Sequence, residues 1–379
     1  MKRVHLDYNA TTPLRSEARE ALLGALDGGL GNASSVHGAG RRGRAAVDEA
    51  RERVAAALQV PEDGVVFTSG GTEANNLALF GALGAGPGDM RLVTSTVEHA
   101  AVHGPALHLQ AAGRDVRWIG VDRSGALDLD ALRAASADGP SLVSVMGANN
   151  EIGSTTDLAE VRARIGGQAV FHSDAVQLLG KKHLDLMGAG VDLASLSAHK
   201  VGGPIGVGVL FRRPGVKVTP TTFGGAQEGE LRPGTENVPA IVAAAVAIEL
   251  AVGEAEAYQQ ETARLTGLLW RGLRAELPNL SLNGPAIDDP TRLTNTLNVS
   301  SPSGDARTLV ARLDLAGVEV SAGSACASGS LEPSHVLKAL GLDPGRARSG
   351  LRISLGAGTQ EADIHTGVER LGRTLGGAP

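Results

Sequence analysis

Seven short apolar runs that alternate with helix-like stretches constrain most strongly how this chain can fold. The runs are GVVFT, RLVTS, VRWIGV, SLVSVM, AVFHSD, LASLSAHK and GVGVLF. Strands that are apolar on both faces are typical of mostly parallel sheets covered by helices on both sides. Ligands of such sheets bind beyond the carboxyl ends of the strands. We therefore expect an α/β domain with its chemistry at those strand ends.

The rest of the chain predicts a second, smaller unit. Residues 15–26 and 41–58 carry helix-spaced apolar positions, and residues 239–277 form a strand-free helical connector. The strand–helix pattern then resumes with TNTLNVS, a helix over residues 306–316, VEVSA, LRISL and a closing helix from about Glu361. A chain of 379 residues also exceeds what one hydrophobic core usually supports. We expect a large α/β domain followed by a smaller C-terminal α+β domain.

Charge and composition narrow the classes of partner. A net charge of -6 without long basic runs gives no electrostatic footprint for nucleic acid or anionic lipid. The longest apolar stretch, residues 241–252, contains Glu249 and is too short to span a bilayer, and no secretory signal is readable before Asp7. The single cysteine, Cys326, agrees with a reducing compartment. We expect a cytoplasmic protein whose partners are small molecules and proteins, with no nucleic acid and no membrane.

Lys200 is the first candidate reactive group. The chain has six lysines against twenty-nine arginines, and this lysine lies between an apolar run and the sequence VGG. Removal from water at such a strand end lowers the pKa of a lysine and makes its amine a nucleophile suited to a Schiff base. The position is equally compatible with a lysine whose amine reaches solvent.

Asp174, at the end of the run AVFHSD, gives Lys200 a chemical partner. Alone, such a carboxylate is usually a loop cap. Pyridoxal phosphate, however, acts as an electron sink only while its ring nitrogen is protonated, and a buried carboxylate beside that nitrogen keeps the proton in place. Gln177, three residues further on, has an amide that can donate to a cofactor oxygen. Lys200 and Asp174 together therefore indicate pyridoxal phosphate.

The motif FTSGGTEANN supplies a cradle for a phosphate. It predicts a strand, a turn at Gly70 and Gly71, and then Thr72 at the start of a helix whose free N–H groups point at an anion. Thr72 with Asn75 and Asn76 also fits an ordinary helix cap, so the motif is weak evidence by itself.

Two histidines raise the question of a metal. His99 and His103 are four residues apart on a predicted helix, but the order H-E-x-x-H is missing and no further ligand cluster stands out. We predict no metal site. His99, directly after Glu98 near a helix start, is better explained as an acid/base group over a planar cofactor.

Cys326 and Arg352 complete the candidates. A solitary cysteine is usually a small buried hydrophobe. Cys326, however, lies in SAGSACASGSLEPS, whose small, flexible residues favour a reactive thiol on a mobile loop. Arg352, in LRISL, has the planar donors that hold a substrate carboxylate with two hydrogen bonds, although structural arginines are common.

Taken together, these residues resemble the cysteine desulfurases, pyridoxal phosphate enzymes of the class V aminotransferase group. Ten ordered motifs carry the resemblance over nearly the whole chain: LDYNATTP, GNASSVHGAGR, FTSGGTEANN, VEHAAV, NNEIG, FHSDAVQ, SAHK, RPGTENVPA, GSACASGSLEPSHVL and LRISLG. The long stretch around Cys326 is similar to the branch that serves iron–sulfur cluster assembly. Ala33, where a proline is usual, and Ile205, where a lysine is common, depart from the pattern away from the proposed chemistry.

The resemblance implies a pyridoxal phosphate enzyme of fold type I that forms a homodimer. Its large cofactor-binding domain would span residues 15–257 and contain a mostly parallel seven-stranded sheet. Residues 1–14 and 258–379 would form the small α+β domain that carries the Cys326 loop.

The resemblance also implies a role for each catalytic candidate. Lys200 would attach the cofactor as a Schiff base and act as the general base. Cys326 would accept the sulfur, and His99 would stack on the cofactor ring and carry protons. Asp174 would contact the pyridinium nitrogen, and Gln177 the side of the ring hydroxyl.

Further positions would bind the cofactor phosphate or the substrate. The implied phosphate ligands are Gly71, Thr72, Ser197, His199 and, reaching in from the partner subunit, Thr235. Asn150 would contact the cofactor or the substrate, and Arg352 the substrate carboxylate.

The implied reaction converts L-cysteine to L-alanine and leaves its sulfur as a persulfide on Cys326, from which a sulfur-acceptor or iron–sulfur scaffold protein takes it. Two alternatives stay open. Another fold type I enzyme, an aminotransferase or a selenocysteine lyase, would share the cofactor residues without needing Cys326. A non-enzymatic scaffold descended from this fold would need neither Lys200 nor Asp174. The sequence does not name the acceptor, nor does it decide between clusters, tRNA thiolation and another pathway.

Overall fold

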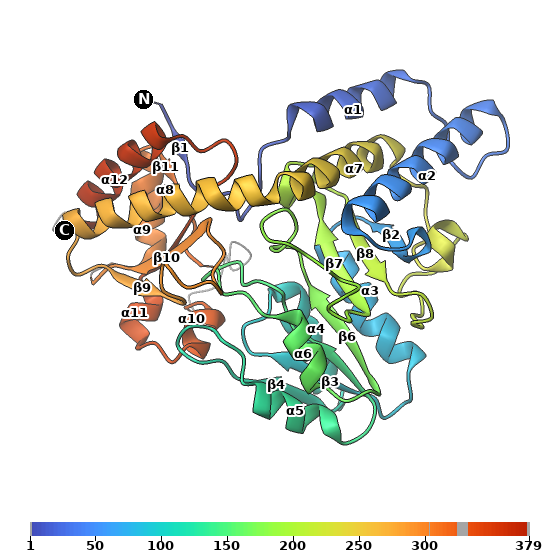
Figure 1. Ribbon diagram of the computed structural model, residues 1–379, viewed down its shortest axis with the longest axis horizontal. Coiled ribbons are helices and arrows are strands. Elements are labelled where there is room, and N and C mark those ends of the chain that lie inside the picture. The colour runs from blue at the N-terminus through green and yellow to red at the C-terminus, as the bar shows by residue number, and fades with distance from the viewer. Residues whose placement is uncertain (1, 303, 324–332, 377–379) are drawn as a thin grey trace.

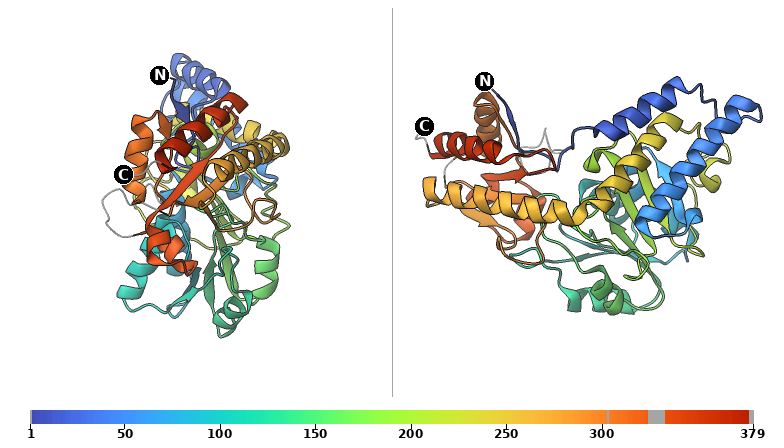
Figure 2. Two further views of the ribbon diagram at one scale, coloured as in Figure 1. Left: turned by 90° about the vertical axis from the view of Figure 1, so that its left-hand side faces the viewer. Right: turned by 45° about the horizontal axis from the view of Figure 1, so that its top comes forward.

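The chain folds into two sheet-centred parts, and the long helix α8 (Ala255–Glu276) runs between them (Figure 1). The computed structural model describes residues 2–302, 304–323 and 333–376. A seven-stranded sheet forms the larger part and a three-stranded sheet the smaller one. Both chain ends lie at the smaller part, which Figure 2 shows from two further sides.

The larger sheet confirms the predicted α/β class and the seven mostly parallel strands. Its spatial order is β2-β8-β7-β6-β5-β3-β4. β8 is antiparallel to both of its neighbours, β2 and β7, and all other neighbouring pairs are parallel. The carboxyl ends of the parallel strands therefore meet at one edge, and Asp174 and Ser197 are the last residues of β6 and β7 there. The strands are β2 (Val65–Thr68), β3 (Arg91–Ser95), β4 (Val116–Ile119), β5 (Ser141–Ser144), β6 (Ala169–Asp174), β7 (Leu193–Ser197) and β8 (Gly208–Arg212).

Helices cover both faces of this sheet, which explains why its strands lack polar alternation. In β5, Leu142 joins the hydrophobic core under α3 and α4, whereas the next residue, Val143, joins the core under α2 and α7. Successive strand side chains point to opposite faces, so both must be apolar. The helices around this sheet are α1 (Ser16–Asp27), α2 (Gly38–Leu58), α3 (Gly71–Ala85), α4 (Ala100–Ala111), α5 (Leu129–Ala137), α6 (Leu158–Arg164) and α7 (Val238–Gly253), with 3₁₀ turns η1 (Glu62–Gly64), η2 (Ala198–Val201) and η3 (Gln227–Glu230).

The predicted strand-free helical connector consists of two helices. α7 and α8 meet at Glu254 and are bent by 67° relative to each other. α7 packs against α1 and α2, while α8 continues to the three-stranded sheet (Figure 1). In the described part of the chain, no single helix has the length and apolar character to cross a membrane, although the bent pair α7 and α8 meets both criteria together.

The smaller sheet is antiparallel, in the order β12-β10-β9. Helices α8, α9 and α12 supply its hydrophobic core. The N-terminal residues join this part because β1 (Val4–His5) pairs in parallel with β11 (Val318–Glu319). The short strand β9 and the five-residue helices α10 and α11 were not predicted, because segments of this length leave too little periodicity to read. The remaining elements are β9 (Ser281–Asn283), β10 (Thr296–Ser300), β12 (Gly350–Ser354), α9 (Ala306–Leu315), α10 (His335–Ala339), α11 (Pro344–Arg348) and α12 (Glu361–Gly376).

Candidate functional site

A cavity of about 240 Å³ at the carboxyl ends of β6 and β7 collects residues that the sequence predicted from separate motifs. Every predicted site residue in the described part of the chain except Thr235 lines it. The predicted residues there are Gly71, Thr72, His99, Asn150, Asp174, Gln177, Ser197, His199, Lys200 and Arg352. Sequence reasoning gave no site role to the remaining lining residues, which are Asn9, Ala10, Asn75, Met146 and Val176.

Asp174 is the buried carboxylate of the cavity, with 4% of the residue exposed. The side-chain amide of Asn75 donates to Oδ2 at 2.7 Å, and the backbone N–H of Val176 donates to Oδ1 at 3.1 Å. These bonds replace part of the hydration that burial removes. The side-chain oxygen of Asn75, Oδ1, is buried and has no hydrogen-bond partner among the described residues. The sequence suggested only a helix-capping role for Asn75, whereas in the structure the Asn75 side chain donates to Asp174.

Lys200 lies in the 3₁₀ turn η2 directly after β7. Its Nζ donates to the backbone carbonyls of Asn9 at 2.7 Å and Ala10 at 2.8 Å. Both carbonyls belong to the N-terminal motif LDYNATTP. The amine is therefore fixed at the cavity wall by a chain segment about 190 residues earlier in the sequence.

His99 immediately precedes α4, as its cap residue, and does not belong to the helix itself. Its Nδ1 accepts the backbone N–H of Ala101 at 3.1 Å, so the neutral ring carries its proton on Nε2. Burial lowers the pKa of His99; the charge of Asp174 opposes this shift, and that of Lys200 adds to it. His99 thus presents a neutral imidazole with an Nε2 proton.

His103 turns away from the cavity and packs against two aromatic rings. Its ring centroid lies 5.0 Å from Trp118 and 4.5 Å from His335. Within the described ranges, no three His, Cys, Asp or Glu side chains are grouped as metal ligands. His99 lines the cavity, whereas His103 does not.

Glu98, the residue before His99, lies beside this cavity and was not predicted as a site residue. It is fully buried, and its Oε1 accepts from Ser95 Oγ at 2.6 Å and from the backbone N–H of Met146 at 2.9 Å. Burial raises the pKa of Glu98 to about 8, and the charge of Asp174 shifts it in the same direction. Its carboxyl group is therefore mostly protonated at pH 7 and adds little negative charge beside His99.

The amino end of α3 forms an anion cradle. The cap residue Gly70 has no side chain that could accept a hydrogen bond from the helix. N–H groups of the first turn are therefore available to an anion. A Cβ on Gly71 would lie 2.9 Å from Val176 Cγ2, so a larger residue here would displace the Val176 side chain that lines the cavity. Burial lowers the pKa of His199 to about 4, and Lys200 and Lys181 add to this shift. His199 is therefore neutral at pH 7.

Arg352 forms the opposite wall and is 1% exposed. Its Nη2 donates to Asp7 Oδ1 at 2.8 Å and to Ser321 Oγ at 3.1 Å, and its Nη1 donates to the carbonyl of Asn150 at 3.1 Å. Its Nε is buried and has no hydrogen-bond partner in the part of the chain that the structure describes. The guanidinium group is thus anchored on one side and keeps an unused donor. Asp7, which the sequence did not single out, provides the anchoring charge.

Two predicted residues are not among the described residues that line this cavity, for different reasons. Thr235 is exposed and does not line it. Cys326 lies outside the described residues. On one side of that gap Ser321 contacts Arg352, and on the other Ser334 donates to Glu151 Oε2 at 2.6 Å.

The donor set fits pyridoxal phosphate. An amine at Lys200, a buried carboxylate at Asp174 and a neutral imidazole at His99 face one cavity, and the uncapped start of α3 suits a phosphate. The unpartnered atoms Asn75 Oδ1 and Arg352 Nε are further groups that a polar ligand would satisfy.

Comparisons with known proteins identify the same chemistry. The sequence model of the class V aminotransferases matches residues 4–366. The cysteine desulfurase IscS of Dictyoglomus turgidum is 42% identical over 379 residues, which covers 99% of this chain and 95% of the relative. A cysteine desulfurase of Cereibacter sphaeroides is 43% identical over 376 residues, with 98% and 95% covered.

Solved structures agree over the same length. A NifS-like protein superimposes with a TM-score of 0.91 at 33% identity and covers 99% of both chains. A NifS-like protein from Rickettsia africae gives a TM-score of 0.87 at 30% identity, with 98% of this chain and 99% of the other covered. A structure described as SspA in complex with cysteine gives a TM-score of 0.80 at 30% identity, with 93% and 99% covered.

Proposed function

This chain belongs to the class V aminotransferase family and is a pyridoxal phosphate-dependent cysteine desulfurase, and we propose that the cavity around Lys200 is its active site. The substrate is L-cysteine and the organic product is L-alanine. The single observation that carries the assignment of the site is the convergence of Lys200, Asp174 and Arg352 on one cavity from three distant segments of the chain.

Different residues of this cavity would bind different parts of the cofactor and of the substrate. When bound, pyridoxal phosphate supplies an electron sink for the bond broken at the α-carbon of the substrate. Asp174 keeps the ring nitrogen protonated, and the start of α3 with Ser197 and His199 holds the phosphate. Arg352 orients the substrate carboxylate, a role supported by its anchored guanidinium group and unpartnered Nε.

Proton transfer falls to two residues. Lys200 would hold the cofactor through Nζ, and the same amine would accept the α proton of the substrate. His99 delivers a proton from Nε2, a role supported by the hydrogen bond that occupies Nδ1 and by the neutral state of its ring.

Sulfur transfer falls to Cys326. The thiolate of Cys326 attacks the sulfur of the substrate, a sulfur–sulfur bond forms and the carbon–sulfur bond breaks with its electron pair left on carbon. The carbon skeleton takes up protons and leaves as alanine, while Cys326 keeps the sulfur as a persulfide. L-Cysteine and one thiol thus become alanine and one persulfide, and no external oxidant is needed.

The activity assay separates this function from its alternatives. Protein reconstituted with pyridoxal phosphate is incubated with L-cysteine and a thiol, and alanine and sulfide are quantified. We expect equal amounts of both products, with no requirement for a keto acid. Amino transfer to a keto acid without sulfide would identify an aminotransferase instead, and activity confined to selenocysteine would identify a lyase. A protein that binds no cofactor would be a scaffold.

Asp174→Asn is expected to keep the cofactor and lose most of the turnover. The amide preserves shape and can still accept from Asn75, but it cannot hold a proton on the ring nitrogen as a carboxylate does. An ion pair of this kind contributes a few kcal/mol, and each 1.36 kcal/mol is tenfold in rate. Cofactor content from absorbance and alanine formation from L-cysteine are measured on the same sample. A loss of less than about tenfold would contradict the proposed role.

We further propose a cytoplasmic homodimer in which Thr235 of one subunit reaches the phosphate site of the other. The exposed position of Thr235 and the 88% exposed Phe223 in the same region support a surface that a second subunit covers. Light scattering should then give about twice the 38.5 kDa mass of one chain. A monomer that is fully active would contradict this proposal. The sulfur would pass to an acceptor or scaffold protein for iron–sulfur clusters or thiolated products.

A further inference from the structure

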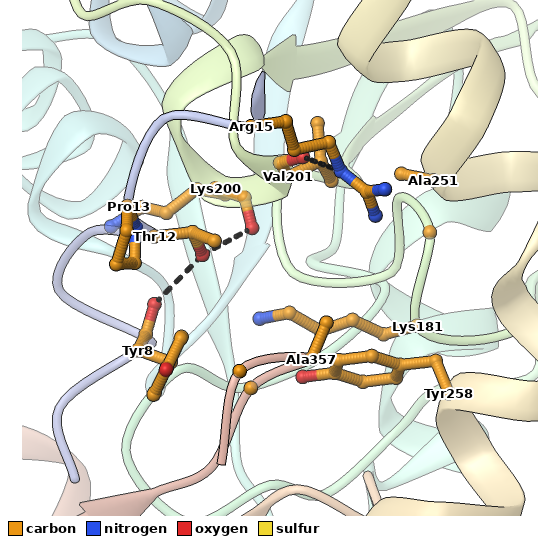
Figure 3. Close-up of a pocket in the computed structure, with 13 residues that line it drawn as sticks. Tyr8, Thr12, Pro13, Arg15, Lys181, Lys200, Val201, Ala251, Tyr258 and Ala357 are labelled. Atoms are coloured by element: carbon orange, nitrogen blue, oxygen red, sulfur yellow. Dashed lines mark hydrogen bonds between the residues drawn. The ribbon is translucent and has the colours of Figure 1, made fainter. Parts of the chain in front are cut away.

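Lys181 is a buried lysine to which the reaction assigns no role. The residue is 4% exposed and lines a second cavity, of about 210 Å³, that shares Lys200 with the active site. Figure 3 shows its amine pointing past Tyr258 toward the N-terminal segment. In the described part of the chain no carboxylate forms an ion pair with Lys181, and burial lowers its pKa well below the ordinary value, with Lys200 and Arg352 adding to the shift. Burying an amine without a carboxylate partner costs free energy of folding, so the burial of Lys181 requires an explanation.

The contacts of Lys181 supply that reason. Its Nζ donates to Asn9 Oδ1 at 3.0 Å and also to Gln177 Oε1. The other end of the Gln177 amide, Nε2, donates to the backbone carbonyl of Asn9 at 3.3 Å. A backbone carbonyl can only accept, so both contacts set the same orientation of the Gln177 amide. One Nε2 hydrogen is engaged with Asn9, and the second remains for the active-site cavity that Gln177 lines.

We propose that Lys181 is a positioning residue that holds Gln177 as a hydrogen-bond donor toward the ring oxygen of the bound cofactor. This inference rests on the proposed function, because it needs pyridoxal phosphate in the cavity. Without Lys181, Gln177 Oε1 would lose its buried donor and the amide would lose one of the two contacts that orient it. A donor beside the ring oxygen stabilises negative charge there, so its loss makes deprotonation of the bound cofactor harder.

The test follows the visible absorption band of the reconstituted protein as a function of pH, without substrate. Lys181→Met removes the donor at similar length, and Lys182→Met is the matched control, because Lys182 donates to Thr155 Oγ1 and the Pro290 carbonyl instead. We expect the titration midpoint of Lys181→Met to rise by about half a pH unit or more, as expected from the loss of one net hydrogen bond. The midpoint of Lys182→Met should equal that of the native protein.

A double-mutant cycle separates action through Gln177 from a direct effect of the lysine charge. Gln177→Leu alone should raise the midpoint, and adding Lys181→Met should raise it no further. The groups facing the cofactor site, His99, Asp174, His199, Lys200 and Arg352, are unchanged throughout. Additive shifts would overturn the inference, because Lys181 would then act independently of Gln177.

Further outcomes keep the two proposals distinguishable. Lys181→Gln, which can still donate to Gln177 Oε1, should have a midpoint nearer to the native value than Lys181→Met, and it replaces that variant if the methionine protein does not fold. A native midpoint in both Lys181 variants would refute the positioning role and leave the desulfurase assignment intact. If the native protein binds no cofactor at all, the proposed active site itself fails.

Discussion

Lys200→Ala is expected to abolish the visible absorption of covalently bound cofactor and to reduce alanine formation from L-cysteine to background. The reason is that Lys200 lines the cavity that contains Asp174 and His99, whereas Lys181 does not line it. The substitution removes both the covalent attachment and the base that accepts the α proton. Absorbance after reconstitution and the yield of a borohydride-reduced adduct measure the effect.

The control for this substitution is Lys217→Ala, at an exposed position that does not line either cavity. It should keep the native absorbance and activity. Unfolding curves of both apoproteins show whether the fold is intact. If Lys200→Ala still formed a reduced adduct at stoichiometric yield, the attachment site would have to be another amine.

Cys326→Ser is expected to bind the cofactor normally and to respond to L-cysteine by a change in absorbance, yet to make almost no alanine. Binding and α-proton removal use the cavity residues, whereas sulfur transfer needs the thiol. A serine hydroxyl is a poor nucleophile at sulfur near neutral pH, and a cysteine thiol ionises far more readily. We expect a fall in alanine formation on the order of 10²-fold or more, or roughly 3 kcal/mol in the barrier.

The absorbance change is the internal control for Cys326→Ser, because it reports steps that precede sulfur transfer. A variant that lost both the absorbance change and activity would indicate damage to the cavity instead of a missing nucleophile. Alanine formation at the native rate without added thiol would contradict the role of Cys326 and favour an aminotransferase or lyase.

The fold could be predicted largely from the pattern of apolar runs. Leu142 and Val143 show why: a strand buried on both faces must be apolar at successive positions, and the sequence displays this directly. The strand ends then predicted Lys200 and Asp174 as neighbours. The bend at Glu254 was missed because helical periodicity continues through it and tertiary packing sets the direction of α8. The domain boundaries after residues 14 and 257 stay predictions.

The supporting residues of the site could not be predicted from local sequence. Asp7 holds Arg352 across 345 positions in the chain, and Asn9 holds Lys200 across 191 positions. The local sequence does not indicate that Lys181 is buried either, because a lysine that follows a strand is normally expected to reach solvent. No periodicity or spacing links such partners. These partners become visible only in the folded chain, where their segments meet at one edge of the sheet. The motif LDYNATTP indicated the family, but it did not indicate the roles of Asp7 and Asn9.

Sulfur leaves the substrate for an enzyme thiol in the proposed reaction, and mass spectrometry after a single turnover detects this transfer. The native protein with bound cofactor is mixed with one equivalent of L-cysteine, alkylated without reducing agent and digested. We expect the peptide containing Cys326 to gain one sulfur atom in proportion to the alanine formed, and we expect no such gain in Cys326→Ser. Alanine formation with no added sulfur on that peptide would contradict it.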